Sequence, residues 1–107
     1  MIGGMEMSKV YGYCRVALAN EEEMAEQVRL VGDYCRDNGL TVDKYFCDNG
    51  VSGLTLDRKG LNELLEVLQE GDVVVVRDIA RLSRSYSQCL SLLEQVEDLD
   101  IELKIIN

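Results

Sequence analysis

Four consecutive valines, Val73–Val76, restrict the fold of this chain more than any other feature of its sequence. A short, unbroken run of β-branched apolar residues is typical of a strand that is buried on both faces of a parallel sheet. Helices cover both faces of such sheets. The run therefore indicates a fold in which strands and helices alternate along the chain.

The rest of the sequence shows this alternation. Three further strands are predicted where β-branched and aromatic residues gather, over residues 9–16, 41–47 and 101–106. Three helices are predicted from apolar spacing, the first between the cap residue Asn20 and the stop signal Asn38-Gly39, the others over residues 58–70 and 85–98. The inward side chains expected on the third helix are Cys89, Leu90, Leu93 and Val96.

The order β-α-β-α-β-α-β predicts an α/β domain with a mostly parallel, doubly wound sheet. In such sheets, functional residues lie beyond the carboxyl ends of the strands, near the point where the strand order reverses. The segments that leave the first three strands are therefore the candidates for a functional site. They cover residues 13–19, 48–58 and 77–84.

The chain has a simple organisation. Its 107 residues allow one domain with one core, and its composition, 47% hydrophobic and 29% charged, is that of an ordinary globular chain. No apolar run approaches the ~18 residues of a membrane span. Residues 1–7 lack the basic region and long apolar stretch of a signal peptide, so we interpret them as a cloning remnant or an upstream start that precedes a domain over residues 8–107.

The cysteines indicate a structural role. Cys14, Cys35, Cys47 and Cys89 lie far apart in the sequence, inside predicted strands or helices, and form no C-x-x-C motif. The chain has no histidine, which excludes the common His/Cys zinc sites. We therefore expect buried, reduced thiols in a cytoplasmic protein, with no metal and no cofactor.

The charge of the chain is unevenly distributed. The net charge of −9 by itself argues against binding to phosphate backbones. The three candidate segments nevertheless hold five arginines against three aspartates, a net charge of +2, whereas the remainder has 6 basic and 17 acidic residues, a net charge of −11. One such arginine could be a solvated surface residue paired with Asp, but five from three loops predict one positive, anion-binding surface. They are Arg15, Arg58, Arg77, Arg81 and Arg84.

Three motifs carry most of these arginines. They are Tyr13-Cys14-Arg15-Val16, then Asp48-Asn49-Gly50-Val51-Ser52-Gly53 with Asp57-Arg58 downstream, and finally Arg81-Leu82-Ser83-Arg84. In this order and spacing they resemble the serine recombinase family, the resolvases and invertases, over residues 8–107. The resemblance implies a three-layer α/β/α domain with a mostly parallel sheet in the flavodoxin-like strand order, one strand of the family's mixed sheet being antiparallel.

The resemblance also implies an activity. Members of the family cleave, exchange and rejoin DNA strands at specific sites, through a serine that attacks a phosphodiester and forms a 5′-phosphoserine link. The arginines of this chain that match the family's catalytic arginines, which stabilise the charged transition state, are Arg15, Arg58, Arg81 and Arg84. The residues of this chain that match the family's supporting polar residues are Tyr13, Asp48 and Ser52. Tyr13 is equally typical of a strand aromatic, and Ser52 of a Gly-rich turn.

The sequence departs from the family where the nucleophile belongs. That position, two residues after Arg15, is Ala17, and an alanine cannot attack phosphorus. Cys14 is a poor substitute, because strand alternation points it away from the face that Tyr13, Arg15 and Ala17 share. Ala80 also departs, since many members have Asp or Ser there. We therefore expect a recombinase domain that is inactive with this sequence, by engineering or by natural divergence, the alternative being that another residue has taken over as nucleophile.

Other segments of a recombinase are expected beyond this chain. The family has a long dimerisation helix and a C-terminal DNA-binding domain after the catalytic domain, so the chain is interpreted as an excised N-terminal domain. DNA contact is then expected mainly through the absent domain, and the full-length protein is expected to be a homodimer or tetramer that catalyses resolution, inversion or integration.

Two alternatives remain open from the sequence. One is a non-catalytic module with the recombinase fold that binds DNA or regulates and pairs with active subunits. The other is a flavodoxin-like phosphate-binding or signalling domain, which ranks last. A receiver domain would have clustered acidic residues after the first strand, where this chain has Arg15 and Ala17, and no Gly-rich nucleotide fingerprint is present.

Overall fold

The computed structural model describes residues 8–54 and 58–106, so residues 1–7, predicted as an extension, and Asp57 of the second motif lie outside it. The described elements alternate as the sequence predicts. They are β1 (Val10–Val16), α1 (Glu21–Asp37), β2 (Lys44–Asn49), α2 (Lys59–Val67), β3 (Val73–Val76), α3 (Ile79–Leu82), α4 (Tyr86–Asp98) and β4 (Glu102–Ile105). No helix among these residues is long and apolar enough to cross a membrane.

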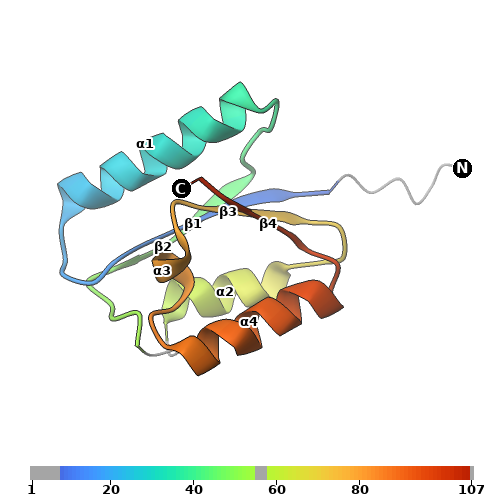
Figure 1. The fold of residues 1–107 in the computed structure, drawn as a ribbon. Helices are drawn as coiled ribbons and strands as arrows, with labels where there is room; N and C mark the ends of the chain where they lie inside the picture. The colour runs from blue at the N-terminus through green and yellow to red at the C-terminus, as the bar shows by residue number, and fades with distance from the viewer. Residues whose placement is uncertain (1–7, 55–57, 107) are drawn as a thin grey trace, which may run out of the picture.

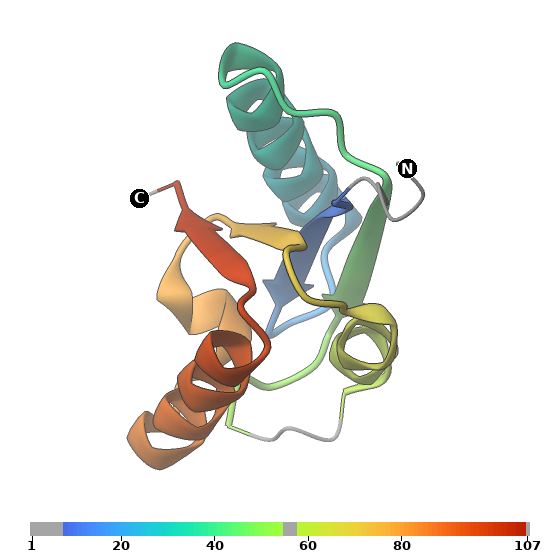
Figure 2. The same cartoon turned by 90° about the vertical axis from the view of Figure 1, so that its right-hand side faces the viewer.

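The strands form one parallel sheet in the order β2-β1-β3-β4. Helix α1 covers one face of the sheet, and α2 and α4 cover the other (Figures 1 and 2). The predicted three-layer α/β/α architecture and flavodoxin-like strand order are therefore confirmed. All pairings among the described residues are parallel, and the antiparallel strand that the family resemblance implies is not among them.

Alternation along the strands divides the core into two layers. Tyr11, Tyr13 and Phe46 pack with apolar side chains of α2 and α4, whereas Val10 and Cys14 pack on the α1 side. The four valines of β3 contribute to both layers and are all buried, as the sequence predicts. The same alternation confirms that Cys14 points away from the face of Tyr13.

Glycine allows α1 to lie close to the sheet. A Cβ on Gly12 of β1 would stand 2.7 Å from the Tyr45 ring and 3.0 Å from the Val31 side chain of α1. Because real Cβ atoms almost never approach another heavy atom to less than 3.0 Å, a larger residue here would push the Tyr45 ring or α1 outward. Gly12 therefore lets the Tyr45 ring lie across β1, beneath α1.

The predicted ends of several elements are wrong by a few residues. Strand β2 begins at Lys44 rather than Thr41, because the chain first returns from α1 to the sheet edge, where Asp43 N–H donates to the Val10 carbonyl. Helix α2 ends at Val67 rather than Glu70, because Leu68 is already extended. The four-residue α3 was not predicted, since one turn shows no apolar periodicity.

The inward face of α4 differs from the prediction. Leu90 is 44% exposed, whereas Leu92 is buried and Val96 packs against the core. The side chain of Cys89 lies outside the described part of the structure. Among the other cysteines, Cys14 and Cys35 are buried and free as expected, but the prediction for Cys47 is wrong, because β2 is an edge strand and leaves this thiol exposed.

Candidate functional site

Three candidate segments meet at the carboxyl end of β1. Arg15 lies next to the last residue of that strand, Arg58 immediately precedes α2, and Arg81 lies on α3. The predicted convergence is thus observed, but the prediction of one positive surface is wrong for Arg15 and Arg58, which are each only 1% exposed. The site is therefore a buried arginine cluster with Arg81 partly exposed and Arg84 exposed beside it.

Arg15 and Arg81 hold each other by reciprocal hydrogen bonds. The Arg15 guanidinium donates from Nε to the Arg81 carbonyl at 3.1 Å, from Nη2 to the Ala80 carbonyl at 2.7 Å and from Nη1 to the Val51 carbonyl at 2.8 Å. Arg81 Nη1 donates back to the Arg15 carbonyl at 2.7 Å. Each side chain thus fixes the backbone of the other, and Arg15 also fixes the loop after β2.

Arg58 completes the contact with α3. Its Nη1 donates to the Arg81 carbonyl at 2.9 Å and to Tyr13 Oη at 3.2 Å, and its Nη2 donates to the Leu82 carbonyl. The carbonyls at the end of a helix lack partners within the helix, and cations are favoured there. Arg15 and Arg58 therefore cap the C-terminal end of α3.

Asp48 connects Tyr13 to α2 rather than pairing with an arginine. Its Oδ2 accepts hydrogen bonds from Tyr13 Oη at 2.7 Å and from Leu61 N–H at 3.0 Å, and its Oδ1 accepts from Gly60 N–H at 2.8 Å. The carboxylate thus satisfies two N–H groups at the start of α2, where negative charge is favoured. Burial and this bond to Asp48 raise the pKa of Tyr13, which keeps its hydroxyl protonated.

The close approach of α2 to β2 requires glycine. A Cβ on Gly60 would lie 2.8 Å from the Cys47 carbonyl oxygen and 2.9 Å from Asp48 Oδ2. Backbone atoms of a hydrogen-bonded strand cannot move aside as a flexible side chain can. Gly60 therefore permits the contact through which Asp48 caps α2.

Positive charge is concentrated in this cluster. Burial lowers the pKa of Arg15, and the neighbouring charges of Arg81 and Arg58 lower it further. No carboxylate oxygen lies within salt-bridge distance of Arg15 or Arg58 among residues 8–54 and 58–106. Repulsion among like charges in a desolvated place favours an anion at the site's open side.

Asp78 balances the exposed edge of the cluster. It pairs with Arg77 at 3.0 Å and with Arg81 at 3.1 Å. Burial opposes ionisation of Asp78, but hydrogen bonds from Arg77 and Arg81 outweigh it and lower the pKa of this carboxyl. Arg77, the fifth predicted arginine, is thus engaged with Asp78 rather than with the buried arginines.

Small residues border the cluster. Ala17, at the nucleophile position of the resemblance, is exposed just after β1, and the Ala80 carbonyl accepts from Arg15. Ser52 is exposed, and its Oγ accepts from Leu54 N–H at 3.0 Å, as in a serine turn. Ser83 is buried, and its Oγ donates a hydrogen bond to the Gly53 carbonyl at 3.4 Å. The supporting role predicted for Ser52 stays a prediction.

Gln27 belongs to this neighbourhood and was missed from the sequence. It is fully buried on α1, and its side-chain amide contacts the backbone of Arg15. A glutamine within an amphipathic helix carries no signal that distinguishes a buried amide from a solvated one. Only its spacing, three residues after Met24 and four before Val31, indicated the inward face of the helix.

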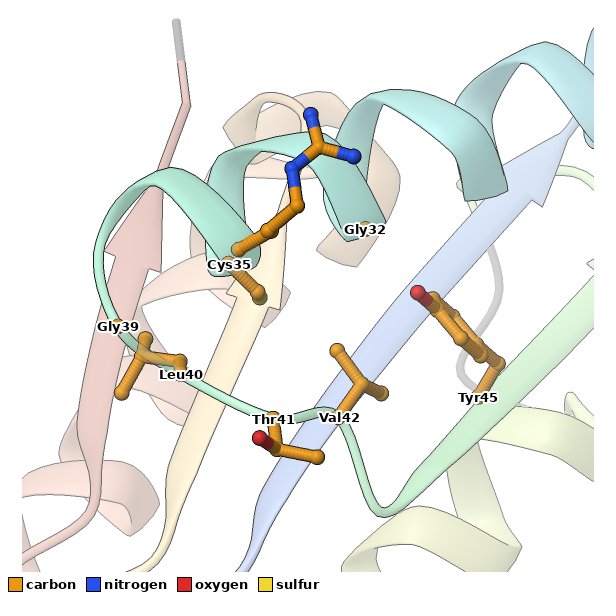
Figure 3. A pocket seen from close by; sticks show the side chains of 8 residues that line it. Gly32, Cys35, Gly39, Leu40, Thr41, Val42 and Tyr45 are labelled. Carbon is orange, nitrogen blue, oxygen red and sulfur yellow. The ribbon is translucent and has the colours of Figure 1, made fainter.

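A hollow in the surface lies away from the arginines. It has a volume of about 480 Å³ and lies between the end of α1 and the start of β2 (Figure 3). Its lining includes Cys35, Leu40, Val42 and Tyr45 but none of the predicted site residues. Within the described ranges, no group of three or more Cys, Asp or Glu side chains is placed to hold a metal ion.

Cys47 is expected to be the most reactive thiol among Cys14, Cys35 and Cys47. It pairs in register with Cys14, and a hydrogen bond from the Cys14 thiol lowers the pKa of Cys47 to about 7, against burial and the charge of Asp48. Since the thiolate is the nucleophile, alkylation of native Cys47 by iodoacetamide should accelerate as pH rises through about 7 and then level off.

Peptide mass spectrometry of samples quenched at intervals measures this rate for each cysteine. Cys14 and Cys35 should react only after unfolding, because both are buried. In Cys14→Ala, which lacks the hydrogen-bond donor, alkylation of Cys47 at pH 7 should slow several-fold. A native Cys47 rate that keeps rising to pH 9 contradicts the prediction.

The family model for the resolvase N-terminal domain matches residues 10–107. The chain belongs to this family, as the three arginine motifs predicted. It is 27% identical over 99 residues to the transposon Tn3 resolvase of Escherichia coli, covering 92% of this chain and 50% of that protein. It is 32% identical over 92 residues to the Tn917 resolvase of Enterococcus faecalis, covering 86% of this chain and 46% of that protein. The chain thus spans about half the length of these relatives.

Solved structures agree with this assignment. The N-terminal catalytic domain of TP901-1 integrase superposes with a TM-score of 0.84 at 29% identity, covering 94% of this chain and 79% of that one. A serine recombinase from Sulfolobus solfataricus superposes with a TM-score of 0.77 at 26% identity, covering 94% and 69%. The fold and the family are therefore those of serine recombinase catalytic domains.

Proposed function

We propose that this chain is the catalytic-type domain of a site-specific DNA recombinase, and that one phosphodiester of the DNA binds at the accessible side of its arginine cluster, where Arg81 and Arg84 reach the surface. The observation that carries the proposal is the meeting of Arg15, Arg58 and Arg81 in one place, with Arg84 exposed beside them. A phosphoryl group that is attacked gains negative charge on its oxygens, and fixed cations stabilise that charge.

In the proposed reaction a serine hydroxyl attacks phosphorus, forms a 5′-phosphoserine bond and releases a 3′-hydroxyl, and reversal with a new strand reseals the DNA. The energy of the phosphodiester is retained in the phosphoserine, so no cofactor is needed. Ala17 supplies no hydroxyl at the matching position. The domain with Ala17 is therefore proposed to bind DNA but not to cleave it.

Ala17 also favours a second candidate function, a non-catalytic recombinase-fold module that regulates or pairs with active subunits. The two candidates make different predictions for the genuine full-length sequence. A serine at position 17 favours a catalytic domain that was mutated, and an alanine favours the module. In either case the proposed whole protein is a cytoplasmic homodimer or tetramer that contacts DNA mainly through segments outside this chain.

The phosphate contact is testable by fluorescence anisotropy with a labelled DNA duplex. The isolated chain should bind weakly and without sequence preference, because its net charge is −9, and binding should fade between 50 and 200 mM salt, concentrations over which phosphate contacts weaken. Arg84→Ala should weaken binding several-fold and reduce the salt slope by about 1, as expected for one lost phosphate contact.

Arg36→Ala is the matched control for this measurement. Arg36 is 71% exposed on α1, where it contacts Asp33 and Asp37, and it lies away from the cluster. Its removal should affect binding much less than the removal of Arg84. Equal effects of the two substitutions, or sub-micromolar sequence-selective binding by this chain alone, would overturn the proposed placement of the phosphate.

A further inference from the structure

The starting observation is a buried amide that contacts one residue of the main chain twice. Gln27 has no exposed surface. Its Oε1 accepts from Arg15 N–H at 2.9 Å, and its Nε2 donates to the Arg15 carbonyl at 3.1 Å. A side-chain amide that both accepts from and donates to one residue does what a neighbouring strand does for the edge of a sheet.

The sheet itself explains why Arg15 needs such a partner. Strand β3 pairs with β1 only as far as Tyr13, opposite Val76, so Arg15 lies two residues beyond the last pair. On the other side, β2 continues to pair with β1 through Val16. Without Gln27, the N–H of Arg15 would be buried without a partner, which is destabilising.

The Arg15 backbone in turn holds the rest of the cluster. Its carbonyl also accepts from Arg81 Nη1 at 2.7 Å, and its guanidinium holds the carbonyls of Ala80 and Arg81. A shift of this backbone would therefore move both guanidinium groups. Such shifts matter for chemistry, because displacements of about 1 Å in a reacting site can cost on the order of 100-fold in rate.

We propose that Gln27 is a positioning residue of the arginine cluster, which replaces the missing strand partner of Arg15 and so sets the places of the Arg15 and Arg81 guanidinium groups. The claim that this placement serves phosphate binding rests on the function proposed above. The placement itself does not depend on that function, and the two are tested by separate measurements.

The first test compares Gln27→Met with the unchanged chain by NMR hydrogen exchange. Methionine keeps the length and volume of the side chain but neither accepts from nor donates to Arg15. Exchange of the Nε–H groups of Arg15 and Arg81 should accelerate at least about tenfold more than exchange of the Val75 amide, which lies in the core and reports global unfolding. Acceleration of all three by one factor would mean a merely structural role and would overturn the proposal.

Asp72→Ala is the matched control. Asp72 is also buried, and its Oδ1 accepts from Lys9 N–H at 3.0 Å near the other end of β1. It thus satisfies a backbone N–H immediately before β1, far from the arginines. In Asp72→Ala, the exchange rates of the Arg15 and Arg81 Nε–H groups should change by the same factor as that of the Val75 amide. Selective acceleration of the two Nε–H groups in this control would refute the specific role of Gln27.

A second variant gives a pH readout. A protonated carboxyl can donate and accept like an amide, whereas a carboxylate repels the Arg15 carbonyl. In Gln27→Glu, we compare the hydrogen-exchange protection of the two Nε–H groups with that in the unchanged chain at the same pH. This protection should be retained at low pH and lost as pH rises through the pKa of the new carboxyl. A flat profile over this range would contradict the proposal.

Inorganic phosphate separates this inference from the proposed function. If the cluster binds phosphate, Gln27→Met should weaken phosphate binding about tenfold while Asp72→Ala leaves it nearly unchanged. If neither the unchanged chain nor any variant binds phosphate, the proposed function is wrong. The exchange measurements alone then decide whether Gln27 positions the arginines.

Discussion

On the proposed function, Ala17→Ser in a longer protein that carries this domain together with a DNA-binding segment is expected to produce a covalent protein–DNA adduct, where the same protein with Ala17 gives none. Loss of an attacking group typically lowers turnover by about 10⁴-fold or more, so restoring it should change the result from undetectable to plain. Ala17 is exposed, so one added hydroxyl should leave the fold intact. Denaturing gels on a cognate DNA site measure the adduct.

Ala25→Ser is the matched control for this experiment. Ala25 is also exposed, but it lies on α1 rather than at the end of β1. It should give no adduct. An adduct with Ala17 unchanged would mean another nucleophile, and exposed Ser52 would then be examined before Ser83, which is buried.

Absence of an adduct in Ala17→Ser, on DNA shown to be bound, would favour the non-catalytic module. Ala80 would then be the second departure from the family to examine. The Ala80 carbonyl accepts a hydrogen bond from Arg15. This contact uses the backbone alone, so a substitution of the Ala80 side chain should leave it intact. Ala80→Asp combined with Ala17→Ser would show whether two substitutions together removed the chemistry.

The fold was predictable from the sequence because its signals are local. The valine run of β3 requires burial on both faces, and the Asn20 cap accepts from Glu23 N–H at 3.0 Å as the capping pattern predicts. The start of β2 was not predictable to the residue. Thr41 and Val42 are good strand formers, but the chain there still crosses from α1 to the sheet edge.

The meeting of the arginines was predictable from the sequence, and their contacts were not. Arginines that follow parallel strands must meet at one edge of the sheet, and Arg15, Arg58 and Arg81 do so. Their burial was not predictable, because it depends on the carbonyls of α3, a single turn without a sequence signal. Gln27 was missed for a related reason, since its partner is a backbone that β3 fails to reach.

Asp48 shows how a structural contact can underlie a site residue. The resemblance suggests a supporting role for it, and in the structure it joins the start of α2 to Tyr13, whose hydroxyl accepts from Arg58. Loss of Asp48 would therefore act on stability first and reach the arginines through Tyr13. This order of effects separates Asp48 from Ala17, where the expected effect is on chemistry alone.

Asp48→Ala is accordingly expected to lower the free energy of unfolding by about 4 kcal/mol. It would leave three buried donors without a partner, the N–H groups of Gly60 and Leu61 and the hydroxyl of Tyr13, and each such group costs roughly 1–3 kcal/mol. Against a typical total of about 5–15 kcal/mol, this is a large share. Urea unfolding followed by circular dichroism measures the loss.

Asp43→Ala provides the comparison that makes the Asp48 result specific. Asp43 is exposed, and its Oδ2 accepts only the N–H of Val10, at 2.8 Å, among the hydrogen bonds of the described residues. Its removal should cost about 1 kcal/mol, because water can replace one exposed acceptor. If Asp48→Ala costs no more than Asp43→Ala, the Asp48 carboxylate does not hold α2 against β2. The path from α2 through Tyr13 to Arg58 would then have to be abandoned.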